Sequence, residues 1–173
     1  MIYLKEGNLT IRSMKESDIE DFPLAFEQQG WYKPQELYKD YYMQQSKKEI
    51  EVIVAENDDR VAGYAVLKPG AHYGPFQTTN TPEIADLNVL IKFQKNGIGH
   101  KIMDTSEKLA KEKSESVSLA VGLHSGYGSA QRIYIKRGYI PDGSGVWYKG
   151  KPLAQYADCN NSDELTLYLL KKL

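Results

Sequence analysis

Cysteine is nearly absent from this chain of 173 residues, which contains only Cys159. A single cysteine excludes a disulfide within the chain and any metal site built from several thiolates. Cys159 lies in a polar, acidic stretch, residues 158–163, which disfavours a nucleophilic role. The three histidines show no metal-ligand spacing, so we expect no metal.

Long apolar runs and basic runs are missing as well. No stretch approaches the roughly 20 apolar residues that span a bilayer, and residues 1–6 lack the pattern of a signal peptide. A net charge of −1 without a cluster of Lys or Arg argues against nucleic-acid binding. We therefore expect a cytoplasmic protein without membrane or nucleic-acid partners. Its length predicts one domain over residues 1–173, acting as a monomer or homodimer.

Residues 83–103 show the clearest change of pattern and predict a strand, a tight polar turn and a helix. The almost continuous apolar run at residues 84–91 is typical of a strand covered on both faces. The turn contains Gly97 and Gly99, which permit positive φ and close backbone approach, and a periodic segment continues as a helix from Ile102. Unpaired N–H groups and the positive end of the helix dipole meet in such a turn, which favours a phosphate or diphosphate ligand.

Two glycines alone would also fit a plain loop, so the neighbouring residues must show whether the turn binds a phosphate. A dinucleotide fingerprint would need a third glycine at Ile102, and a P-loop would need Ser or Thr at Pro152. Neither is present. The turn instead has the pattern Gln94-x-x-Gly97-x-Gly99 directly after a strand.

This pattern resembles the GNAT superfamily of acyl-CoA-dependent N-acetyltransferases, whose pyrophosphate loop reads Arg/Gln-x-x-Gly-x-Gly/Ala. Residues 130–139, Ala-Gln-Arg-Ile-Tyr-Ile-Lys-Arg-Gly-Tyr, are similar to the family's Ala-x-x-Leu-Tyr-x-x-x-Gly-Phe/Tyr segment. The two motifs occur in the family's order, and the resemblance covers residues 83–139. The chain departs from the family at Tyr127, where Asn is frequent.

Hydrophobic periodicity predicts the remaining elements. Asn57-Asp-Asp-Arg60 indicates a hairpin, a capping box at Ser17-Asp-Ile-Glu20 indicates a helix start, and Pro23 predicts that this helix is short or kinked. The order is β-α-α-β-β-β-α-β-α-β-β. It predicts an α/β (α+β mixed sheet) protein with a twisted, mostly antiparallel sheet and helices on both faces, as the GNAT resemblance also implies. Strands are expected at residues 9–13, 51–56, 61–67, 84–91, 116–124, 139–148 and 164–170, and helices near residues 17–26, 34–46, 102–113 and 128–137.

The resemblance implies a site for acetyl-CoA, with no metal. The pantetheine arm would pair with the strand at Leu87, Val89 and Ile91, and a strand N–H would polarise the thioester oxygen. Ser129 and Arg137 would add polar contacts. The diphosphate would lie on the backbone amides of Gln94, Lys95, Asn96, Gly97, Ile98 and Gly99.

Acetyl transfer to an alkylamine needs a base, because an amine with a pKa near 10.4 is neutral only about once in 2500 molecules at pH 7. Glu83 lies six residues before Val89, where histone-type members of the family have their general base. Asp86 lies three residues before Val89, where polyamine-type members have a substrate-binding acid. The two should face opposite sides of a regular strand unless a bulge intervenes. His124, at a strand end, is a third candidate.

Tyr134 matches the tyrosine that serves as general acid in the family and protonates the departing CoA sulfur; the alternative is a core tyrosine on a short helix. Aromatic residues of the second helix, including Tyr38 and Tyr41, would pack against the sheet. Together with Trp31, Glu36 and Asp40 they would alternatively suit a cationic amine.

The sequence therefore predicts an N-acetyltransferase that moves the acetyl group of acetyl-CoA directly to a primary amine, with a small molecule favoured as acceptor. A protein or peptide N-terminus or lysine is the alternative acceptor. A non-catalytic acyl-CoA-binding regulatory module is the alternative from a different class.

Overall fold

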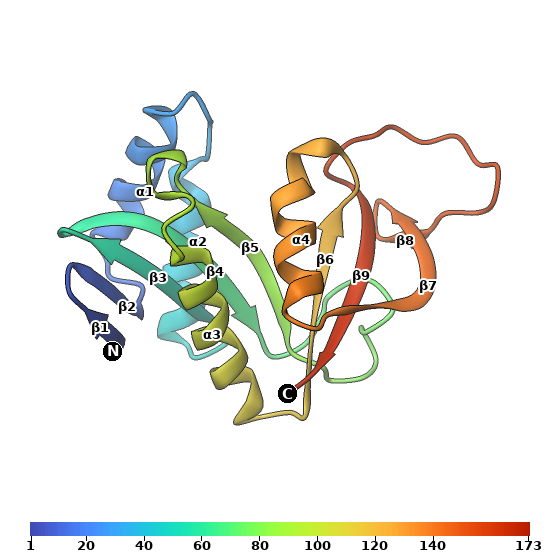
Figure 1. Cartoon of the computed structure of the whole chain (residues 1–173), viewed down its shortest axis with the longest axis horizontal. Helices are drawn as coiled ribbons and strands as arrows, with labels where there is room; N and C mark the ends of the chain where they lie inside the picture. Colours follow the sequence, from blue (N-terminus) through green and yellow to red (C-terminus); the bar gives the residue numbers. More distant parts are fainter. The chain divides into compact units, whose positions relative to one another are not determined.

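The computed structural model describes residues 1–173, which form four α-helices and nine β-strands (Figure 1). The chain divides into two compact units. The first consists of Met1–Lys68 and Ile84–Leu109, and the second of Pro69–Glu83 and Ala110–Leu173. The single domain expected over residues 1–173 stays a prediction.

The first unit is built on strands in the order β1-β2-β3-β4-β5, of which the first four pair antiparallel. The β3–β4 hairpin turns at Asp58 and Asp59, whose φ angles of 50° and 58° fit the two-residue turn that the sequence predicted there. The strands are β1 Ile2–Glu6, β2 Leu9–Ser13, β3 Glu51–Asn57, β4 Arg60–Lys68 and β5 Glu83–Val89, whose first residue belongs to the second unit.

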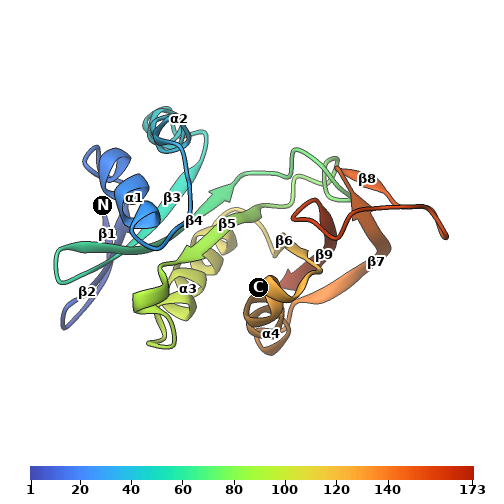
Figure 2. The same ribbon diagram turned by 90° about the horizontal axis from the view of Figure 1, so that it is seen from above.

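Helices cover both faces of this sheet, as predicted. Helices α1 (Asp18–Glu27) and α2 (Gln35–Ser46) lie on one face, and α3 (Ile98–Lys111) lies on the other (Figure 2). Phe22 of α1 packs on Tyr64 of β4 with ring centroids 4.9 Å apart. On the opposite face, an added Cβ at Gly63 would lie 3.3 Å from the Ile102 side chain, so α3 packs directly on the β4 backbone.

The second unit contains four antiparallel strands in the order β6-β9-β7-β8 and the helix α4 (Gly128–Lys136). Glu83, the first residue of β5, pairs parallel with Ser118 of β6. A second apolar cluster joins Phe76 and Tyr168 to Trp147. The strands are β6 Ser116–Gly122, β7 Ile140–Tyr148, β8 Lys151–Pro152 and β9 Leu165–Lys172.

The mixed, mostly antiparallel strand pairing agrees with the predicted fold class, whereas several boundaries differ. Strands β1 and β8 were not predicted, and α3 begins at Ile98 rather than at Ile102. Ser17 makes no side-chain capping hydrogen bond; the Asp18 carboxylate is instead buried and binds the Arg12 guanidinium through two hydrogen bonds of 2.7 and 2.8 Å. No helix combines the length and the apolar character needed to cross a membrane.

Candidate functional site

The turn between β5 and α3 is exposed and free of covering side chains. Lys95 and Gly97 have positive φ angles of 63° and 77°. A Cβ built at Gly97 would meet nothing within 4 Å, and one at Gly99 would meet only a Val89 methyl group at 3.6 Å. The first turn of any α-helix leaves N–H groups without partners in the helix, and here no side chain fills the space above both glycines. The turn therefore fits a diphosphate sterically and electrostatically.

Two backbone groups at the end of β5 are bound by glutamine side chains of the same unit. Gln94 Nε2 donates to the Val89 carbonyl at 2.9 Å, and the Ile91 N–H donates to Gln29 Oε1 at 2.9 Å. Gln29 Nε2 is buried without an acceptor. A pantetheine arm paired with Val89 and Ile91 would have to replace these two amides. That exchange would trade one amide hydrogen bond for another.

Strand β5 is less covered than its apolar sequence predicted, because all five residues from 85 to 89, Leu87 included, are only half-buried. Asp86 adopts a left-handed conformation with φ of 48°, as one residue of some β-bulges does. This residue breaks the regular alternation of side chains along β5. The expectation that Glu83 and Asp86 face opposite sides of β5 assumed a regular strand, and the strand is irregular at Asp86.

The Asp86 carboxylate accepts hydrogen bonds from four side chains. Oδ1 accepts from Lys33 Nζ and from Asn88 Nδ2, each at 2.8 Å. Oδ2 accepts from the Tyr64 hydroxyl at 2.5 Å and from the Tyr41 hydroxyl at 3.0 Å. In this arrangement Asp86 is a bound anion, and it would have to release a donor before it could accept a proton from an amine.

Aromatic rings complete the surroundings of the Lys33 ammonium group. Nζ lies 5.2 Å from the Phe26 ring centroid, within range of a cation–π interaction, and donates to the Tyr64 hydroxyl at 2.7 Å. We call Asp86, Phe26, Tyr41 and Tyr64 the ammonium seat, and Lys33 is its occupant. All five belong to the first unit.

The phenols of the ammonium seat stay protonated at physiological pH. Burial, and next the Asp86 charge, raise the pKa of Tyr64 and of Tyr41 well above the ordinary value. Both hydroxyls therefore act as hydrogen-bond donors to the carboxylate. The seat as a whole binds a primary ammonium group with one anion, one phenol oxygen and one ring face.

Tyr134 lies on α4 in the second unit and is buried, with 7% of its surface exposed. Burial raises the pKa of Tyr134 to about 12, so the phenol keeps its proton throughout the physiological range. A general acid must be protonated, and Tyr134 meets that condition. Ser129 is exposed on the first turn of α4, and Arg137 is the half-buried C-cap of the same helix.

Glu83 and His124 also belong to the second unit. Glu83 is half-buried, and its charge, after burial, helps to raise the pKa of Tyr168. The Gly126 N–H donates to His124 Nδ1 at 3.1 Å, so the proton of a neutral imidazole resides on Nε2, which is 2.8 Å from Asp163. With both ring nitrogens engaged, His124 has no lone pair for an amine in this arrangement.

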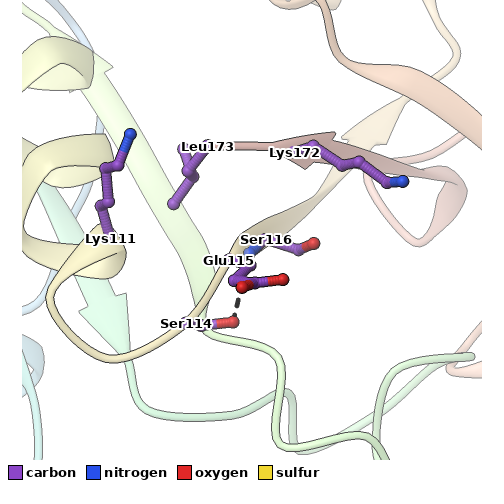
Figure 3. A pocket seen from close by; sticks show the side chains of 6 residues that line it. All are labelled: Lys111, Ser114, Glu115, Ser116, Lys172 and Leu173. Carbon is purple, nitrogen blue, oxygen red and sulfur yellow. Dashed lines mark hydrogen bonds between the residues drawn. The ribbon is translucent and has the colours of Figure 1, made fainter.

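A shallow surface pocket of about 340 Å³ lies in the second unit, beside the C-terminus (Figure 3). Lys111, Glu115 and Lys172 contribute to its lining, and Ser114 Oγ accepts a hydrogen bond from the Ser116 N–H. None of these residues was predicted to bind or react. No group of three or more His, Cys, Asp or Glu side chains is arranged to hold a metal ion.

Sequence reasoning missed most of the ammonium seat. It singled out Asp86 and Tyr41, but it paired the aromatic residues with Glu36 and Asp40, which are exposed on α2. One feature of the sequence could have pointed to Lys33. It follows two aromatic residues and precedes Pro34, which restricts its backbone to extended conformations. Tyr64 looked like any alternating residue of a buried strand.

Comparison with known proteins gives one family match. The model of the acetyltransferase (GNAT) family matches residues 11–139, most of the chain. A search of curated proteins found no match.

Solved structures with the same fold include acetyltransferases whose names give different substrates. A ribosomal-protein-alanine N-acetyltransferase from Brucella melitensis is 17% identical, with 94% of this chain and 99% of that chain covered and a TM-score of 0.69. A GNAT family acetyltransferase from Elizabethkingia anophelis with acetyl-CoA bound is 20% identical (97% and 100% covered, TM-score 0.62). Mutant forms of the spermidine/spermine N-acetyltransferase SpeG from Vibrio cholerae are 12% identical (96% and 95%, TM-score 0.66). At these identities the likeness shows the fold.

Proposed function

Because this chain belongs to the acetyltransferase (GNAT) family, we propose that it transfers the acetyl group of acetyl-CoA directly to a primary amine of a small molecule. Membership confirms the predicted family, fold and enzyme class, with acetyl-CoA as cosubstrate. The acceptor and the residues that act on it are the new part of the proposal.

The observation that carries the donor site is the uncovered turn at Gly97 and Gly99. A ligand diphosphate on the amides of this turn would bind at the positive end of α3 and need no rearrangement of neighbouring side chains. A side chain packed over either glycine would have blocked such a ligand. The proposed diphosphate contacts are the amides of Lys95, Asn96, Gly97, Ile98 and Gly99, because the Gln94 N–H already donates to the Ile91 carbonyl at 3.1 Å.

The ammonium seat supports a small alkylamine as acceptor. A carboxylate, a phenol oxygen and a ring face in it together bind a primary ammonium group. The structural neighbours alone do not select the acceptor, since one acts on a polyamine and another on a ribosomal-protein alanine. The seat fits the head group of an unbranched alkylamine, which is the reason to favour such an amine over a peptide N-terminus.

The proposed reaction needs a base and an acid. The amine nitrogen attacks the thioester carbonyl, the carbon–sulfur bond breaks, and the sulfur leaves as a thiolate that takes a proton. We propose Tyr134 as the donor of that proton, because burial keeps its phenol protonated. Glu83 and Asp86 remain the proposed bases, acting directly or through water.

A screen of acceptors tests this function. Release of the CoA thiol is followed with purified protein, acetyl-CoA and, separately, alkylamines, polyamines, aminoglycosides and peptides, and each product is identified by mass spectrometry. We expect turnover with at least one small alkylamine and a mass gain of one acetyl group on it. Turnover with peptides alone would replace the proposed acceptor. Acetyl-CoA binding without turnover of any amine would favour the regulatory module.

A further inference from the structure

Lys33 is a primary alkylammonium group that already occupies a seat suited to such groups. Its Nζ atom forms hydrogen bonds to Asp86 at 2.8 Å and to Tyr64 at 2.7 Å and lies 5.2 Å from the Phe26 ring centroid. The partners come from β4, β5 and α1, whereas Lys33 itself lies in the connection between α1 and α2. The seat is therefore formed by regular elements, and its occupant comes from a connecting segment.

We propose that Lys33 is a resident competitor that holds the acceptor site, and that an alkylammonium substrate binds by replacing the Lys33 ammonium group on Asp86. This inference rests on the proposed function, because only an acetyltransferase has an acceptor amine. It predicts selection for a protonated primary amine at the end of an unbranched alkyl chain, because that is the chemistry of the group the seat now binds.

The Lys33 side chain can leave without unfolding the unit. Its side chain is 20% exposed and that of Asp86 is 25% exposed, so both ends of the ion pair reach solvent. Pro34 restricts the backbone of Lys33 to extended conformations, and Gln29 ties the same connection to the Ile91 N–H. A change of side-chain torsions in Lys33 is then sufficient to vacate the seat.

The rest of the seat stays in place when Lys33 leaves. Tyr64, Tyr41 and Asn88 still donate to the Asp86 carboxylate, which keeps its position and its charge. An uncompensated, partly buried carboxylate beside aromatic rings attracts the next available cation. A neutral molecule of the same shape gains nothing from this charge, so the seat discriminates by charge as well as by size.

Competition by Lys33 determines how much the affinity for an alkylammonium ion should change when Lys33 is removed. When a binding-competent state is populated by a fraction f, the apparent dissociation constant rises by 1/f. If Lys33 fills the seat for about 90% of the time, its removal lowers the apparent constant for an alkylammonium ion about tenfold. The maximal rate should change less than the KM, since Lys33 is absent from the seat whenever the substrate is bound.

The test is Lys33→Met, which keeps an unbranched side chain, one atom shorter than that of lysine, and removes the charge. Binding of n-butylammonium is measured by calorimetry, with n-butanol as the neutral ligand and Lys39→Met as the control, because Lys39 is exposed on α2 and lies outside the seat. We expect n-butylammonium to bind Lys33→Met about tenfold more tightly than the parent or Lys39→Met, and n-butanol not to bind. An affinity for n-butylammonium that is equal in all three proteins, or lower in Lys33→Met, overturns the inference.

A second variant separates loss of the seat from loss of the fold. In Lys33→Met with Asp86→Asn, the gain in affinity should disappear while the melting temperature stays near that of Lys33→Met. If the double variant binds as tightly as the single one, the ammonium group does not sit on Asp86 and the inference is wrong. This binding test needs no turnover. A protein that acetylates no amine would therefore refute the proposed function and leave the measured competition intact.

Discussion

Tyr134→Phe tests the proposed general acid most sharply. The change removes one oxygen atom from a ring that is 7% exposed and lies 5.9 Å from the Tyr139 ring, measured between centroids. Since the ring remains, the fold and the affinity for acetyl-CoA should hold. General acids contribute about 100- to 10,000-fold to rate, so we expect kcat to fall by at least about 100-fold, equivalent to about 2.7 kcal/mol of transition-state stabilisation.

The pKa of Tyr134 also fixes how the proton moves. A thiol has an ordinary pKa near 8.5, about 3.5 units below the value of about 12 that burial gives Tyr134, so complete transfer to the free thiolate is uphill by about 4.8 kcal/mol. Tyr134 should therefore donate a hydrogen bond to the sulfur while the carbon–sulfur bond breaks. Completion of the transfer would follow as the thiolate leaves.

A pH–rate profile measures the pKa of Tyr134. The acid form of a tyrosine is lost as pH rises through its pKa, and for Tyr134 that happens near 12. At saturating amine, where the profile reports the enzyme–substrate complex, kcat should show no descending limb below about pH 11. At low amine concentration the rate should instead fall above about pH 10.4, because the seat binds the protonated amine. Short pH-jump assays avoid alkaline unfolding. A descending limb near pH 10 that Tyr134→Phe abolishes would refute the raised pKa, and an unchanged kcat in Tyr134→Phe would refute the role.

Three further substitutions probe the fold and the donor site. Gly63→Ala should destabilise the protein by about 3 kcal/mol in chemical denaturation, because the new Cβ would lie 2.5 Å from the Asn88 carbonyl oxygen, a backbone atom. Asp18→Asn should lower the free energy of unfolding by about 2 kcal/mol, since it removes one of the two anions that pair with the buried Arg12 guanidinium and leaves only Glu56. Gly99→Ala should keep or slightly raise the melting temperature, as alanine favours a helix, yet weaken acetyl-CoA binding at least about tenfold, because its methyl group would occupy the space proposed for the diphosphate.

Matched variants give the controls. Gly70→Ala adds the same methyl group where nothing lies within 4 Å, and Glu20→Gln removes a charge from an exposed site of α1. Both should behave like the parent protein. Stability of Gly63→Ala or Asp18→Asn equal to that of its control would contradict the packing or the ion pair. Unchanged acetyl-CoA affinity in Gly99→Ala would contradict the proposed diphosphate position.

Local patterns predicted much of the fold. The hairpin at Asp58 and Asp59 and the start of α2 after Pro34 follow from short-range backbone preferences, which tertiary packing did not override. The Ser17 capping box was wrong because Ser17 has helical backbone angles, φ −60° and ψ −27°, and not the extended ones of a capping residue. The buried pair of Arg12 and Asp18 was missed because it joins β2 to α1, and no local pattern predicts that contact.

The candidate site likewise has one part that follows from the local sequence and one part that depends on packing. The turn at Gly97 and Gly99 is a local motif, so its position was predictable from spacing alone. The ammonium seat and its occupant depend on Lys33, Tyr64 and Asp86, which lie on three separate segments and meet only through packing. The left-handed conformation of Asp86 was equally hidden, because aspartate adopts it only where its surroundings compensate the strain.

The central claim is that the amides of the turn before α3 bind the diphosphate of acetyl-CoA. Calorimetric titration with acetyl-CoA and with S-acetyl-4′-phosphopantetheine, which has the same thioester arm but lacks the diphosphate and the adenosine, tests it. Titration of Gly99→Ala beside the parent protein isolates the diphosphate, because the added methyl group should weaken only the binding of acetyl-CoA. We predict tight binding of acetyl-CoA and binding of the truncated ligand that is at least about 100-fold weaker, a difference of about 2.7 kcal/mol. Equal affinities for the two ligands, or no binding of acetyl-CoA, would contradict the claim.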